Sequence, residues 1–191
     1  MKKIILSFVF VALSLPNLQA QTQSQADQAA SSAAASLASM ANAKSAASAA
    51  QSVADGQWGL VDDRLDYWVN QGVPYSWFTD EHETEFWTPY YNDAYFITTG
   101  FFLSQDGLLQ SEALPNQLVA EGNAAYAAWD YATAYAKYNA AAQHYAQLSS
   151  SWSSLETQVT DAGDDMDAIH YPKTDVLGNL FMALYGGGPG Y

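Results

Sequence analysis

Cysteine is absent from this 191-residue chain, and its absence excludes two kinds of chemistry. The chain forms no disulfide bond, and it has no cysteine nucleophile for covalent catalysis. Its stability must therefore come from the packing of side chains. The 6 Trp, 13 Tyr and 8 Phe residues provide enough aromatic material for a hydrophobic core.

Long hydrophobic runs are also missing. The longest mainly apolar run, residues 4–15, is too short to span a bilayer. It follows two lysines, is broken by a proline, and is followed by Ala20, a small residue suited to cleavage before Gln21. We therefore expect residues 1–20 to be a secretory signal peptide, with the protein periplasmic or secreted and no membrane insertion after cleavage.

Basic residues are scarce. The chain has 6 Lys and Arg against 20 Asp and Glu, a net charge of −14 at pH 7. Cleavage after Ala20 removes two lysines, which leaves four basic residues and a net charge of −16. Such a surface repels phosphate backbones and anionic lipid, which excludes nucleic acid as a partner. It also attracts cationic partners.

Catalytic and metal-binding motifs are missing as well. The chain has no Gly-x-Ser-x-Gly elbow, no glycine-rich phosphate loop and no paired-histidine HExxH spacing. His82 stands among Glu81, Glu83 and Glu85, which we interpret as an exposed acidic helix, with the two outer glutamates on one face. Asp161–Asp167 lacks the alternating spacing of a calcium loop. We therefore assign no catalytic residue, no metal and no cofactor, and we expect the protein not to be an enzyme.

The mature chain divides into three segments by composition. Residues 21–54 are rich in Ala, Ser and Gln, and predict an alanine-packed helix or stalk that is a candidate for self-association. Residues 55–185 predict one helical domain. Residues 186–191, Gly-Gly-Gly-Pro-Gly-Tyr, predict a flexible tail.

Several short signals predict where helices begin and end. Helix breaks are expected at Asp55-Gly56, at Gln105–Gly107 and at Ser149–Ser151, and a stop at Gly72–Pro74. Asp80 with a glutamate three residues later resembles a capping box. The aromatic stretch 90–104 suits either a helix or a strand, and we favour a helix because its surroundings are helical.

The stretch 116–148 predicts a hairpin of two antiparallel helices. Asp130 is a good residue to begin the second helix. In that helix, tyrosines and alanines recur at spacings of three and four and form one face: Tyr131, Ala134, Tyr135, Tyr138, Ala141, Ala142 and Tyr145. Small alanines allow a close approach of the neighbouring helix, and tyrosines fill the space beside them. The fold class expected is all-α, a helical bundle built on this hairpin.

The same stretch resembles one unit of the tetratricopeptide repeat family. The matching positions are Gly122, Asn123, Tyr126, Asp130, Tyr131, Ala134, Tyr138 and Ala141. Trp129 stands where the family usually has glycine, the closing proline is missing, and no second copy follows at the family's period of about 34 residues. The resemblance implies that most of these residues form the core. It also implies binding of a protein partner through the first helix, where Asn123 is the matching residue.

Two functions follow from these patterns. The first is an exported, non-enzymatic protein–protein interaction module, with Asn123 as its candidate binding residue. The alternative is an extracellular carbohydrate-binding protein or small glycan hydrolase that uses the aromatic and acidic region 75–95. Its candidate glycan-binding residues are Trp77, Trp87 and Tyr91, because flat rings stack on sugar faces and carboxylates accept hydrogen bonds from hydroxyls.

Overall fold

A computed structural model describes the backbone of residues 2–186 and the side chains of residues 23–186. The expected signal peptide, 1–20, therefore lies outside the described side chains, and most of the tail 186–191 lies outside the described residues. Every regular element from residue 2 to residue 186 is helical, which confirms the all-α fold class. No helix among the residues with described side chains is long and apolar enough to cross a membrane.

The helices lie in two compact units. Unit 1 comprises Met1–Ala43 and Leu108–Ser151, and unit 2 comprises Lys44–Gly107 and Trp152–Tyr191. The elements, in chain order, are α1 (Lys2–Asn70), two π-helical turns (Trp77–Glu81 and Glu83–Trp87), α2 (Thr88–Tyr95), a π-helical turn (Phe96–Gly100), α3 (Phe101–Ser111), α4 (Ala113–Ala127), α5 (Tyr131–Asp165), a last π-helical turn (Met166–His170) and α6 (Tyr171–Tyr185).

The core residues of α1 and α5 follow a seven-residue repeat. In α1 the buried series is Ala26, Ala33, Met40, Ala47, Ala54, Val61 and Trp68. In α5 and the π-helical turn that follows it, two series alternate: Tyr131, Tyr138, Tyr145, Trp152, Val159 and Met166, with Ala134, Ala141, Leu148, Leu155 and Ala162 between them. A repeat of 3.5 residues per turn is typical of helices packed as a coiled coil. The repeat therefore gives the alanine-rich part of α1 one buried side.

Three predicted helix breaks are wrong. α1 continues through Asp55-Gly56, α3 through Gln105–Gly107 and α5 through Ser149–Ser151. A glycine in a helix costs only about 1 kcal/mol. Buried residues lie on both sides of the sites in α1 and α5, Ala54 and Val61 beside the first and Leu148 and Trp152 beside the other, and in α3 Phe101 is buried before the site. Their packing outweighs the local tendency to break the helix, because packing supplies most helical stability in proteins.

The predicted stop after α1 is confirmed. Gly72 adopts a left-handed backbone with φ of 95°, and the amide of Val73 donates to the carbonyl of Trp68 at 3.1 Å. This hydrogen bond closes a Schellman motif, in which glycine is favoured because it carries no Cβ. Val73 is buried, so the chain leaves α1 anchored to the core.

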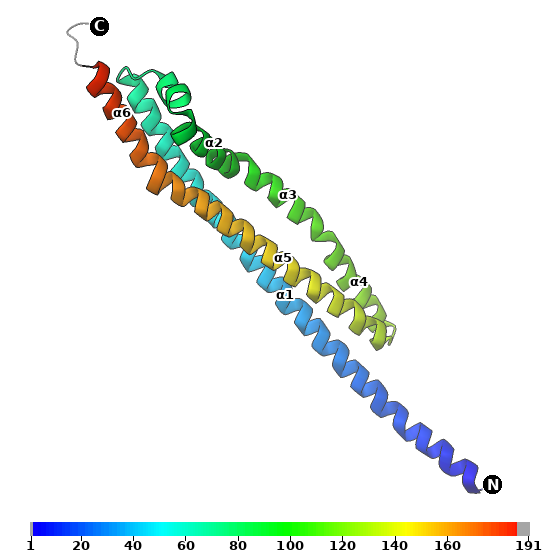
Figure 1. Ribbon diagram of the computed structural model, residues 1–191. Helices are drawn as coiled ribbons and strands as arrows, with labels where there is room; N and C mark the ends of the chain where they lie inside the picture. Colours follow the sequence, from blue (N-terminus) through cyan, green and yellow to red (C-terminus); the bar gives the residue numbers. More distant parts are fainter. Residues whose placement is uncertain (1, 187–191) are drawn as a thin grey trace. The chain divides into compact units, whose positions relative to one another are not determined.

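The helical hairpin of unit 1 forms as the sequence predicts, between α4 and α5 (Figure 1). Asp130 begins α5 by accepting a hydrogen bond from the amide of Thr133 at 3.1 Å. Hydrogen bonds from the side chain and then from the amide of Thr133 lower the pKa of the Asp130 carboxyl. A Cβ atom on the buried Gly122 would lie 2.8 Å from the Tyr138 ring, so α4 needs glycine there. The predicted stripe is wrong at Tyr135, which is exposed because it lies off the seven-residue repeat.

In unit 2, the segment after α1 differs from one prediction. Asp80 lies inside a π-helical turn and accepts a hydrogen bond from the Thr79 hydroxyl at 2.7 Å, so it does not form a capping box. His82 leaves helical geometry at φ −119° and ψ 30°. Glu81 and Glu85 therefore lie in different turns, and the prediction that they lie on one helix face is wrong. The stretch 90–104 is helical, as favoured.

The last helix of unit 2, α6, packs on the end of α1 (Figure 1). Asp175 pairs with Arg64 and also accepts a hydrogen bond from the Trp68 indole at 2.9 Å. A Cβ on Gly178 would lie 2.2 Å from the Trp68 ring, which shows how closely the two helices approach. This contact fixes the position of α6 within unit 2, next to the segment that follows α1.

Candidate functional site

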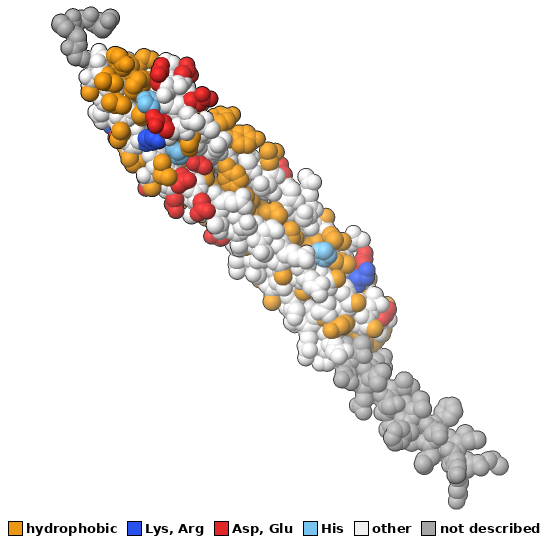
Figure 2. Space-filling model, in the orientation of Figure 1, with side chains coloured by type: hydrophobic (Ala, Val, Ile, Leu, Met, Phe, Trp, Pro, Cys, Tyr) orange, Lys and Arg blue, Asp and Glu red, His pale blue; other side chains and the backbone are white. Residues whose placement is uncertain are grey.

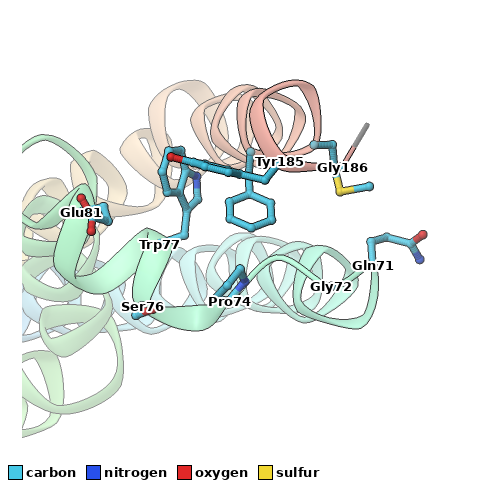
Figure 3. A pocket seen from close by; sticks show the side chains of 10 residues that line it. Gln71, Gly72, Pro74, Ser76, Trp77, Glu81, Tyr185 and Gly186 are labelled. Atoms are coloured by element: carbon cyan, nitrogen blue, oxygen red, sulfur yellow. The ribbon is translucent and has the colours of Figure 1, made fainter. Parts of the chain in front are cut away.

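A groove of about 830 Å³ lies in unit 2, open to solvent. One wall is the loop between α1 and the first π-helical turn, with Gly72 and Pro74. The other wall is the end of α6, with Phe181 and Tyr185. Figure 3 shows Trp77, Pro74 and Tyr185 directed into the space between the two walls, with Glu81 at one end and Gln71 at the other. We call it the aromatic groove.

Residues of α6 hold Trp77 in place in this groove. Its indole nitrogen donates a hydrogen bond to the carbonyl of Leu177 in α6 at 3.0 Å. Its ring centre lies 5.4 Å from that of Phe181 and 6.0 Å from that of Tyr185, both nearly perpendicular to it. Edge-to-face packing of this kind is favourable and holds the rings in defined orientations. The groove is therefore formed before any ligand arrives.

Beside the groove, α6 exposes an apolar face. Val176, Leu180 and Leu184 follow one another at intervals of four residues, and all three are exposed. Tyr185, at the rim, is 58% exposed. Figure 2 shows hydrophobic side chains gathered at this end of unit 2, next to acidic ones. A row of exposed apolar side chains with acidic residues nearby is the kind of surface that often marks an interaction site.

The charge around the groove is strongly negative. Unit 2 contains sixteen of the chain's 20 acidic residues and three of its six basic ones. Asp80, Glu81, Glu83 and Glu85 are all exposed in the two π-helical turns next to the groove. Among the described residues that line the groove, Glu81 supplies the charge. The site therefore combines aromatic rings with negative potential.

The glycan-binding residues proposed from the sequence fall into two places. Trp77 lies in the aromatic groove. Trp87, at the end of the second π-helical turn, and Tyr91 instead form a row with Tyr95, at intervals of four residues. Neighbouring ring centres are 6.4 and 6.5 Å apart, at interplanar angles of 34° and 26°. Tyr91 is 54% exposed, so this aromatic row is a second surface that a ligand can reach.

Under the aromatic row, Tyr90 is buried and part of the core. It accepts a hydrogen bond from the Trp58 indole at 3.1 Å and donates to the Asp62 carboxylate. Burial is the main cause of its raised pKa, and the raised pKa keeps the hydroxyl protonated. Tyr90 therefore joins α1 to α2 and is not available to a ligand.

Asn123, the candidate residue from the repeat resemblance, has a partner within the hairpin. Its side-chain oxygen accepts a hydrogen bond from the hydroxyl of Tyr138 at 2.7 Å. A second pair, Tyr145 and Asn116, repeats this arrangement one heptad further along α5 at the same distance. These bonds satisfy the polar ends of two buried tyrosines. They give Asn123 a structural role, and its role in binding stays a prediction.

The histidines of unit 2 also pair within the chain. His82 Nδ1 pairs with the Glu85 carboxylate. His170 is buried between α2 and α6, and its Nε2 lies 2.9 Å from a carboxylate oxygen of Asp93. Within residues 23–186, no three His, Asp or Glu side chains are grouped as metal ligands.

That α6 forms part of the site was not predicted from the sequence. Within 176–185, α6 packs on the core through Leu177 and Gly178, which are buried, and its other apolar side chains are exposed or half-buried. The regular four-residue spacing of exposed apolar residues was the signal that pointed to an open helix face. No family model, curated protein or solved structure matches this chain.

Proposed function

We propose that this protein is an exported, non-enzymatic helical protein that binds a protein partner through the aromatic groove and the adjoining face of α6. The carrying observation is that Phe181 and Tyr185 meet Trp77 in an open groove beside exposed apolar residues. Binding energy at protein interfaces concentrates in aromatic residues at the centre of an apolar patch with a polar rim.

The groove suits binding better than catalysis. Its described lining includes one carboxylate, Glu81, and no nucleophile next to a base. General acid–base or covalent chemistry needs at least two groups placed against a substrate. A preformed groove with fixed rings, in contrast, binds a partner with little loss of side-chain freedom.

Export and the repeat resemblance are part of the same proposal. Cleavage before Gln21 would release a strongly acidic chain into the periplasm or medium. In that chain, the hairpin of α4 and α5 supports the fold, and the tetratricopeptide-like residues Gly122 and Tyr138 hold its two helices together. Determination of the N-terminal residue of the exported protein tests the cleavage site.

A second candidate function is glycan binding, and the aromatic row favours it. Trp87, Tyr91 and Tyr95 form a row of rings at intervals of four residues, and the planes of neighbouring rings are inclined by 34° and 26°. Sugar rings stack on surfaces of this kind. Replacement of Tyr91 by alanine should then abolish retention of the protein on envelope polysaccharide, whereas it should leave binding at the groove unchanged.

Site-specific crosslinking in the producing cells tests the main proposal. A photoreactive amino acid is placed at Ser76, which is exposed and lines the groove, or at Ser153, an exposed control position on α5 in the same unit. We expect Ser76 to give one discrete adduct with a protein, and Ser153 to give none. The adduct should be lost when Tyr185 is replaced by alanine and retained when it is replaced by phenylalanine.

Three results would contradict the proposal. Equal crosslinking from both positions would mean that the groove is not the binding surface. An adduct with twice the mass of the chain would identify self-association instead of a different partner. Retention on polysaccharide with no protein adduct would favour the aromatic row and glycan binding.

A further inference from the structure

We propose that the occupant of the aromatic groove is a basic amphipathic segment of another exported protein. Its lysine or arginine would lie over the rings of Trp77 and Tyr185, with the carboxylate of Glu81 at the end of the groove. Its apolar side chains would cover Leu180 and Leu184 of α6. This inference rests on the proposed function and adds the chemistry of the partner.

The first argument is charge complementarity. The acidic residues are concentrated in unit 2, and those nearest the groove, from Asp80 to Glu85, are exposed. The basic side chains of the same unit are already engaged. Arg64 pairs with Asp175, Lys173 donates to the carbonyl of Glu85, and Lys44 lies over the Trp152 ring. The negative potential around the groove therefore favours a cationic partner, and it repels a second copy of this acidic chain.

The second argument is the chemistry of the rings. A cation lies favourably over the face of Trp or Tyr within about 6 Å of the ring centre. This chain already uses the arrangement within unit 2. The Arg64 guanidinium lies 4.3 Å from the ring centre of Tyr67, and Lys44 lies 5.6 Å from that of Trp152. Tyr185, which is exposed, and the half-buried Trp77 beside it offer the same chemistry in the open groove.

The third argument is the apolar face of α6. A fully solvated basic segment would gain nothing from Val176, Leu180 and Leu184, which are exposed in a row beside the groove. A segment that carries basic residues on one side and apolar residues on the other would bury this row while its cations reach the rings. Amphipathic helices that bind grooves use anchors at similar spacings.

A matched set of labelled peptides tests the inference by fluorescence anisotropy at about 0.15 M salt, where distant charges are screened. The first is a 14-residue amphipathic peptide of leucine and lysine, and two others carry glutamine or glutamate in place of every lysine. We expect the lysine peptide to bind at least about tenfold more tightly than the glutamine peptide, and the glutamate peptide not to bind.

Four variants of the protein locate the binding. Tyr185→Ala should weaken binding of the lysine peptide by about five- to tenfold, and Tyr185→Phe should preserve it because the ring remains. Glu81→Gln should weaken binding by about two- to fivefold. Asp55→Asn removes the same charge from an exposed position of α1 outside the groove, and it should change binding less than twofold.

The outcomes separate this inference from the proposed function. Equal affinity for the lysine and glutamine peptides, with both weakened by Tyr185→Ala, would overturn the cationic partner and leave the groove as a binding surface. Equal effects of Glu81→Gln and Asp55→Asn would also overturn the inference, because the attraction would then be diffuse. If Tyr185→Ala changes the binding of no peptide and removes no crosslink, the proposed function fails too.

Discussion

Replacement of Gly122 by alanine tests the packing of the hairpin in unit 1. A Cβ at this position would lie 2.8 Å from Cε1, 2.9 Å from Cδ1 and 3.2 Å from Cζ of the Tyr138 ring. Carbon atoms in contact normally lie about 3.5–4.0 Å apart, so the ring would have to move by roughly 1 Å. It has little room, because Tyr138 is buried and its hydroxyl is bonded to Asn123 at 2.7 Å.

The magnitude follows from two opposing effects. Overpacking of a buried ring costs about 1–3 kcal/mol, whereas alanine is better than glycine inside a helix by about 0.5–1 kcal/mol. We therefore expect Gly122→Ala to lower the free energy of unfolding by about 1–2 kcal/mol. Urea denaturation followed by circular dichroism measures this change.

A double-mutant cycle provides the control. In a Tyr138→Ala background the clash is absent, so Gly122→Ala should stabilise the protein by about 0.5–1 kcal/mol. Gly56→Ala, in α1, should also stabilise it, because no atom lies within 4 Å of the added Cβ. If Gly122→Ala destabilises equally in both backgrounds, the contact with the Tyr138 ring is not the cause and the account of the hairpin is wrong.

Two further changes test the turn of the hairpin and the electrostatics of unit 2. Trp129 has a φ of 64° and is 72% exposed. A positive φ is strained for every residue except glycine, so Trp129→Gly should raise the free energy of unfolding by about 0.5–1 kcal/mol. A loss of stability would show that the Trp129 ring is needed. Burial, with the neighbouring Asp66 and Asp63, raises the pKa of Asp62 from its usual 3.8. The stability that this group contributes is therefore present below pH 3.8 and lost as the pH rises through the raised pKa. Asp62→Asn should melt above the wild type at pH 7, with a difference that shrinks towards pH 3. A constant difference would contradict the assignment.

Much of the fold was accessible from the sequence because the relevant signals are local. Asp130 at the start of α5, Gly72 after α1 and the tyrosine–alanine stripe each act within one or two helical turns. The predicted helix breaks are wrong because they rest on the local preferences of one to three residues, and the packing of the whole helix outweighs those preferences. Gly56 carries a modest helix penalty, and the seven-residue series on which Ala54 and Val61 lie compensates for it through distant contacts.

The candidate site was harder to predict for a physical reason. The groove joins Trp77 to Phe181, about a hundred residues later in the chain, and no local pattern brings them together. The ring pairs 87/91 and 91/95, in contrast, follow from helical spacing alone. Asn123 was chosen through a resemblance, and its contact with Tyr138 shows that a matching position can serve the fold.

The most direct test of the account follows the six tryptophan indole signals by NMR in protein labelled with ¹⁵N-tryptophan. Addition of the leucine–lysine peptide, or of the crosslinked partner once purified, should shift the signal of Trp77 in the groove. The signal of Trp129, at the exposed turn of the hairpin in unit 1, should stay in place. A shift of Trp129 with Trp77 unmoved would show that the partner binds the hairpin, and it would contradict the assignment of the groove.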